Sequence, residues 1–71
     1  MPNSIGQITV EDFKAPLGKF RIMQKELATG RLRILVDFYT EFLAINRIKL
    51  LREESHEYVF TLCDENGPIS E

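Results

Sequence analysis

The sequence lacks the residues on which several classes of small protein depend. Its 71 residues include one cysteine, one histidine and no tryptophan. Cys63 alone cannot form an internal disulfide, which excludes a disulfide-rich scaffold. Cys63 and His56 together supply only half of the ligands of a structural zinc site. Because a chain of this length has a small core, oligomerisation remains as the expected source of additional stability.

Long apolar runs are also absent. The longest, residues 34–36 and 42–45, fall far short of the roughly 20 residues that a membrane-spanning helix needs. Residues 1–10 carry neither the positive charge nor the apolar stretch of a secretory signal. Together with the unpaired thiol, these absences predict a cytoplasmic protein that does not bind membranes.

The chain has no motif of a catalytic or cofactor-binding site. Its four glycines are isolated, so it contains no glycine-rich phosphate loop. His56 lies among glutamates without a nucleophile nearby, as is typical of a solvated loop. Cys63 is followed by two acids, whereas a reactive thiolate needs cationic neighbours, so we expect an inert, buried thiol. We therefore predict a protein that is not an enzyme and uses no cofactor or metal.

Charge is unevenly placed along the chain, although the net charge is only −2. All nine basic residues and three of the eleven acids lie between Lys14 and Arg52, which gives this segment +6 and leaves −8 on its flanks. The middle segment is therefore a candidate for binding an anionic partner. Alternatively, the opposite charges neutralise each other across the folded surface or between two subunits.

The first half of the chain has a helical pattern with a break. Apolar residues follow steps of three and four from Phe13 to Leu27, but Pro16 and Gly18 interrupt them. We expect a short helical turn over residues 10–14, aided by a capping interaction between Thr9 and Asp12. A longer helix over residues 17–28 should follow and end at Gly30.

Residues 31–46 have the strongest helical pattern. Further apolar residues widen the predicted apolar face beyond what a small two-layer domain can cover, so we expect this helix to form a homodimer interface. The interface residues are predicted to be Leu32, Leu35, Val36, Tyr39, Phe42 and Leu43.

The last part of the sequence favours strands. Residues 48–51 and 58–62 are rich in strand-forming residues and flank an acidic turn, so they predict a β-hairpin. Residues 1–6 are expected to be a loose arm, 7–10 a short strand and 64–71 a frayed tail. The predicted fold is thus one small α+β domain over residues 1–71, with two main helices followed by a C-terminal β-hairpin.

This order of elements resembles that of a winged-helix module. Residues 31–62 loosely resemble the C-terminal winged-helix part of bacterial kleisins, where an apolar helix leads into a strand, an acidic turn and a second strand. The resemblance implies a hairpin wing beside a helix that enters the major groove of DNA. It lies in hydrophobic patterning alone and transfers no family residue. The basic residues suited to phosphate contacts are Lys19, Arg21, Lys25, Arg31 and Arg33.

The sequence therefore predicts a small, non-catalytic binding module. The first hypothesis is a homodimeric protein-interaction or regulatory protein with an unidentified protein partner. Nucleic-acid binding by the basic segment 14–52 is the alternative hypothesis. A small enzyme or ligand carrier is the third.

Overall fold

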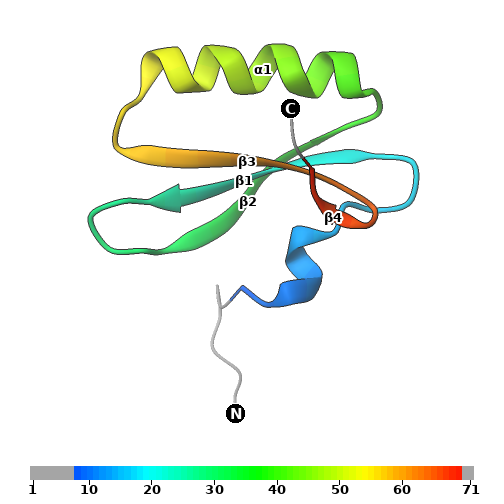
Figure 1. The fold of residues 1–71 in the computed structure, drawn as a ribbon, viewed down its shortest axis with the longest axis horizontal. Coiled ribbons are helices and arrows are strands. Elements are labelled where there is room, and N and C mark those ends of the chain that lie inside the picture. Colours follow the sequence, from blue (N-terminus) through cyan, green and yellow to red (C-terminus); the bar gives the residue numbers. More distant parts are fainter. Residues whose placement is uncertain (1–7, 70–71) are drawn as a thin grey trace.

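One helix and one antiparallel sheet make up the computed structural model, which describes residues 8–69 (Figure 1). The strand order in the sheet is β2-β1-β3-β4, so β1 lies between β2 and β3 and is antiparallel to both. Helix α1 connects β2 to β3 and covers one face of the sheet. The elements are the 3-10 helix η1 (Val10–Phe13), β1 (Phe20–Glu26), β2 (Leu32–Phe38), α1 (Glu41–Glu54), β3 (Tyr58–Asp64) and β4 (Gly67–Pro68).

The predicted order of two helices followed by a hairpin is wrong, and so is the winged-helix-like arrangement. The first helix, predicted over residues 17–28, is absent, and Phe20–Glu26 within that range form β1. As a central strand, β1 is buried on both faces: Ile22 faces α1 and Met23 faces the other way, and both are buried. A strand that is buried on both faces shows no clean alternation of apolar and polar residues. The spacing of its apolar residues therefore could not be distinguished from that of a helix.

The predicted second helix over residues 31–46 is divided between β2 and the start of α1. The boundary is Thr40, which has an extended backbone and whose hydroxyl accepts a hydrogen bond from the Leu43 N–H at 3.2 Å. This is the geometry of a helix N-cap. The helix therefore begins ten residues later than predicted and continues past Asn46 through residues 48–51, which were predicted to be a strand.

Other local predictions are confirmed. Residues 10–13 form a helical turn, and the Asp12 carboxylate accepts a hydrogen bond from the Thr9 N–H at 2.9 Å. Gly30 has a φ of +76°, a conformation that favours glycine, but it ends the turn between β1 and β2 and not the predicted helix. The predicted strand at residues 58–62 is part of β3, but its partner is β1 and not residues 48–51.

The predictions for the two ends of the chain concern an N-terminal arm and strand and a C-terminal tail. Residues 1–6, predicted to be a loose arm, lie outside the described residues, and so does Gln7 of the predicted first strand. Val10, the last residue of that predicted strand, belongs to η1. In place of a tail that frays from Asp64, β4 pairs back onto the end of β3. The Ile69 N–H then donates to the Leu62 carbonyl at 2.9 Å, so residues 64–69 continue the sheet.

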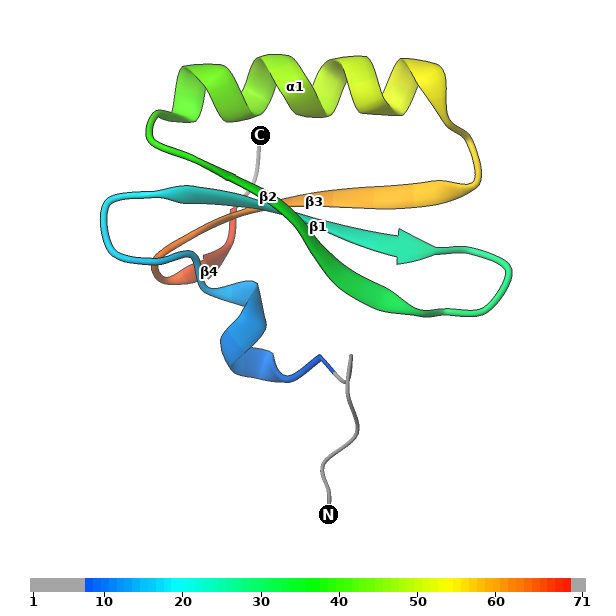
Figure 2. The same ribbon diagram turned by 180° about the vertical axis from the view of Figure 1, so that it is seen from behind.

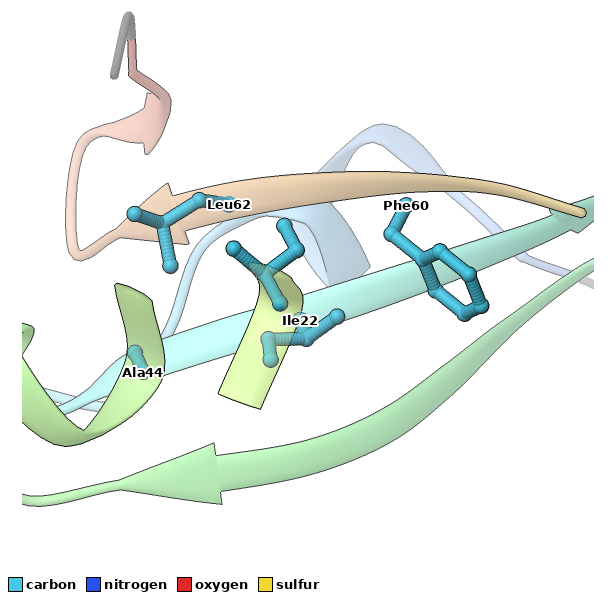
Figure 3. Packing of buried hydrophobic residues seen from close by; sticks show 5 residues of the cluster. Ile22, Ala44, Phe60 and Leu62 are labelled. Atoms are coloured by element: carbon cyan, nitrogen blue, oxygen red, sulfur yellow. The ribbon is translucent and has the colours of Figure 1, made fainter. Parts of the chain in front are cut away.

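The core lies between α1 and the sheet. Side chains from β1, α1 and β3 converge there (Figure 3), and every one of them is almost fully buried. At roughly 25 cal/mol per Å² of apolar area, this cluster is the main stabilising contribution to so small a fold. Its members are Ile22, Ala44, Ile48, Phe60 and Leu62.

The opposite face of the sheet is covered in part by the segment that contains η1 (Figure 2). Met23 and Cys63 are buried on this side, as is Ala15, whose N–H donates to the Asp64 carbonyl at 2.8 Å. Arg21 attaches the same segment to the sheet. Its Nη1 donates to the carbonyls of Asp12 at 3.1 Å and Lys14 at 3.3 Å.

Arg21 also forms a bidentate ion pair with Asp37, which lies directly opposite it on the neighbouring strand β2. Nε donates to Oδ1 at 2.7 Å and Nη2 donates to Oδ2 at 3.1 Å. The hydrogen bond and the charge of Asp37 raise the pKa of the Arg21 guanidinium. A second ion pair joins the exposed Lys14 and Glu11.

Burial of Cys63 gives a prediction for stability at alkaline pH. Burial raises the pKa of this thiol to about 11 from an ordinary value of 9.0, while Arg21 opposes the shift. The folded state therefore favours the neutral thiol, and this contribution is complete below the ordinary pKa and is lost as pH rises toward 11. The Cys63→Ala variant has no such titration. Its deficit in unfolding free energy relative to wild type should shrink by about 1 kcal/mol between pH 7 and pH 10.

Urea unfolding of both proteins under reducing conditions measures this difference. The two proteins share every other ionisable side chain, so the comparison isolates the contribution of Cys63. A deficit that stays constant from pH 7 to pH 10 would contradict the burial of a neutral thiol.

Candidate protein-binding surfaces

The outward face of α1 is the largest concentration of exposed apolar side chains on one element. Ala44 and Ile48 point into the core, and Leu51 packs against it. On the far side, Phe42 is 72% exposed, Leu43 49% and Leu50 51%. Single exposed apolar residues are common, but three on one helix face indicate an interaction surface. We call Phe42, Leu43 and Leu50 the helix patch.

The spacing of the helix patch is that of a helix that packs against another helix. Leu43 and Leu50 are seven residues apart, so they lie on one stripe along α1. Asn46 lies between them on the same stripe and is exposed. Tyr39, which is 76% exposed, precedes the helix, and the Lys19 ammonium lies 4.8 Å from its ring centroid.

Charges of both signs are distributed along α1. Glu41 lies in the first turn, Arg47 and Lys49 are exposed in the middle, and the C-terminal end carries Arg52, Glu53 and Glu54. Carboxylates are unfavourable at a helix C-terminus, where the helix dipole is negative. The two glutamates are therefore placed where a positive partner would stabilise them.

Edge strand β2 carries the second group of candidate residues. An open hollow of about 460 Å³ lies at the β1–β2 turn and has a mixed polar and apolar lining. A smaller hollow of about 260 Å³ lies farther along β2 and is lined by Leu35, Val36, Arg47 and Leu51. The lining of the larger hollow consists of Ile8, Gln24, Glu26, Arg31, Leu32, Arg33 and Tyr58.

The six predicted interface residues do not share a helical face, because they come from two different elements. Leu32, Leu35 and Val36 lie on β2, and the last two pack against the core. Tyr39 precedes α1, Phe42 and Leu43 lie in its first turn, and all three are exposed. Leu50 was missed because it was assigned to a strand. Its distance of seven residues from Leu43 was the signal that places it on the same stripe.

The five residues predicted to contact phosphates are divided between two faces. Arg21 is bound to Asp37, and Lys25 points away from α1. Arg33 lies opposite Gln24 in the register of β1 and β2, on the side of the sheet that faces α1. Lys19 lies over the Tyr39 ring. Only Arg31 and Arg33 line a common hollow. Nucleic-acid binding itself stays a prediction of the sequence.

Metal binding and membrane insertion are two further possibilities for the described part of the chain. Residues 8–69 contain no group of His, Cys, Asp and Glu side chains that is arranged to hold a metal ion. Among the same residues, no helix has the length and apolar character needed to cross a membrane.

Comparison with protein-family models, curated proteins and solved structures finds no significant match.

Proposed function

We propose that this protein is a non-catalytic, homodimeric binding module whose two copies associate through the helix patch. The observation that carries the proposal is the outward exposure of Phe42, Leu43 and Leu50 on the one helix of a two-layer fold. Association would remove these side chains from water and add core to a small domain.

An antiparallel arrangement of the two α1 helices fits the spacing of this surface. The stripe of Leu43, Asn46 and Leu50 would form the seam, since two leucines at heptad spacing pack well between helices. A polar residue within such a seam fixes register, which is the role we assign to Asn46.

The Phe42→Glu substitution should dissociate the dimer. A buried aromatic residue at the centre of an interface commonly contributes 2 kcal/mol or more, so we expect the dissociation constant to rise about thirtyfold or more. Sedimentation equilibrium over a range of concentrations measures this constant. Because dimerisation is coupled to folding, the wild-type melting temperature should also rise with protein concentration, and that of the variant should not.

Val10→Glu is the matched control. Val10 is 76% exposed and lies in η1, on the side of the sheet away from α1. It receives the same charge at similar exposure, so the control variant should dimerise as the wild type does. A wild-type protein that sediments as a folded monomer at high micromolar concentration would refute the proposal.

A further inference from the structure

The two edges of the sheet differ in whether their backbone groups are already bonded. On β3, the carbonyls of Phe60 and Leu62, which point away from β1, are occupied. The Arg52 guanidinium donates to the Phe60 carbonyl at 2.9 Å, and the Ile69 N–H donates to the Leu62 carbonyl at 2.9 Å. Strand β4 covers the end of this edge. Natural proteins protect edge strands from further pairing in this way.

Among residues 8–69, nothing covers the edge of β2 in this way. The Glu26 N–H donates to the Arg31 carbonyl at 2.8 Å, and bonded pairs alternate along an antiparallel ladder. Arg33 is therefore the next residue of β2 that bonds to β1. The backbone N–H and C=O groups of Leu32 and Ile34 then point away from the sheet. Within residues 8–69, no group donates to them or accepts from them.

Positive charge lines the same edge on the side that faces α1. Arg31 and Arg33 are exposed and line the larger hollow, and Arg47 lines the smaller one. No described carboxylate is within ion-pair distance of these three guanidinium groups. The Glu26 carboxylate, which also lines the larger hollow, accepts a hydrogen bond from the Thr29 hydroxyl at 2.8 Å.

A second copy of the chain does not suit this edge. The only acid of β2 is Asp37, which points away from α1 and is paired with Arg21. Two β2 strands would therefore bring arginines together on the side that faces α1 without a carboxylate between them. Like charges across neighbouring strands are destabilising. The arginines thus disfavour self-pairing and favour an acidic partner.

We propose that β2 binds an extended acidic segment of another protein, which adds to the sheet as a fifth strand. Its backbone would bond to Leu32 and Ile34, and alternate carboxylates would pair with Arg31 and Arg33. The residues between the carboxylates would be apolar and would lie on the side of Leu32 and Ile34. The register irregularity between Ile22 and Met23 leaves Leu35 bulged, which limits the added strand to the part of β2 before it.

A labelled peptide of about seven residues, with alternating glutamate and valine, is the probe. Fluorescence anisotropy should detect its binding to the wild-type protein and should detect none for a peptide of alternating lysine and valine. Arg33→Glu should weaken binding about tenfold, because it replaces an attraction by a repulsion. Lys49→Glu makes the same charge change at an exposed site on α1 and should leave the affinity unchanged.

A backbone variant separates strand addition from simple charge attraction. Leu32→Pro removes one outward N–H at the first residue of an edge strand, where proline is tolerated. It should weaken peptide binding while the circular-dichroism melt stays near that of the wild type. Amide hydrogen exchange on the wild-type protein tests the same point without a variant. The peptide should slow exchange at Leu32 and Ile34.

Three outcomes would overturn the proposal. The first is peptide binding that leaves exchange at Leu32 and Ile34 unchanged. The second is equal affinity for the glutamate and lysine peptides. The third is tighter binding of a single-stranded oligonucleotide than of the peptide, with the same loss in Arg33→Glu, which would assign the arginines to nucleic acid. Phe42→Glu should bind the peptide normally, so failure of the dimer and failure of this site are distinguishable.

Discussion

Replacing Ile48 by alanine is expected to unfold most of the protein at 37 °C. Ile48 is fully buried at the centre of the contact between α1 and the sheet. Truncation of such a residue removes transfer free energy and leaves a cavity, which together cost about 2–5 kcal/mol. A core of this size supplies only about 3–5 kcal/mol of net stability. Thermal and urea unfolding followed by circular dichroism measure the loss.

Leu17→Ala provides the comparison for this experiment. The substitution again shortens a large aliphatic side chain, but Leu17 is 84% exposed in the link before β1. We expect a change of less than about 0.5 kcal/mol, as for most surface substitutions. Equal losses for the two variants would contradict the packing of α1 on the sheet.

The parts of the fold that sequence predicts are those fixed by local interactions. The turn at η1 depends on Thr9 and Asp12, which are three residues apart. At Gly30 only the end of an element was predicted, because glycine tolerates positive φ, and the element that ends before it is a strand and not the predicted helix. Strand β3 has strand-forming residues at nearly every position, and its prediction is confirmed. In each case the determining contacts lie within a few residues along the chain.

The failures occur where partners distant in sequence decide the structure. Strand β1 is surrounded by β2, β3, α1 and the η1 segment, so apolar residues are favourable on both of its faces. Residues 31–46 contain the end of one element and the start of another, and both are apolar. Only Thr40 marks the boundary between them. Sequence periodicity cannot distinguish such a pair of short elements from one helix.

On the candidate surfaces too, the sequence predicts features that depend on local interactions and misses those that depend on residues distant in sequence. Phe42 and Leu43 were selected for a helical interface, and the structure places them on an exposed helix face. The unoccupied backbone groups of Leu32 and Ile34 depend on the strand order, which no local pattern encodes. Arg21 was selected as a phosphate contact because it is basic, whereas its charge is paired within the fold.

The role of Arg21 predicts a second large loss of stability. Its side chain is 13% exposed and that of Asp37 25%, so the pair is shielded from solvent on most sides. Arg21→Met keeps much of the aliphatic volume but removes the donors to Asp37 and to the carbonyls of Asp12 and Lys14. Asp37 would be left as a half-buried, unpaired charge. We expect a loss of about 2–3 kcal/mol, somewhat less than for a fully buried pair.

A double-mutant cycle with Asp37→Leu separates the ion pair from the backbone contacts. If the unpaired carboxylate causes most of the damage, the double variant should be more stable than Arg21→Met alone by about 1–2 kcal/mol. The remaining deficit then measures the loss of the bonds to the η1 segment. This deficit should be accompanied by faster amide exchange at Ala15, whose N–H bonds to Asp64 beneath that segment. Strictly additive losses would show that Arg21 acts only on the η1 segment and that its pairing with Asp37 contributes nothing.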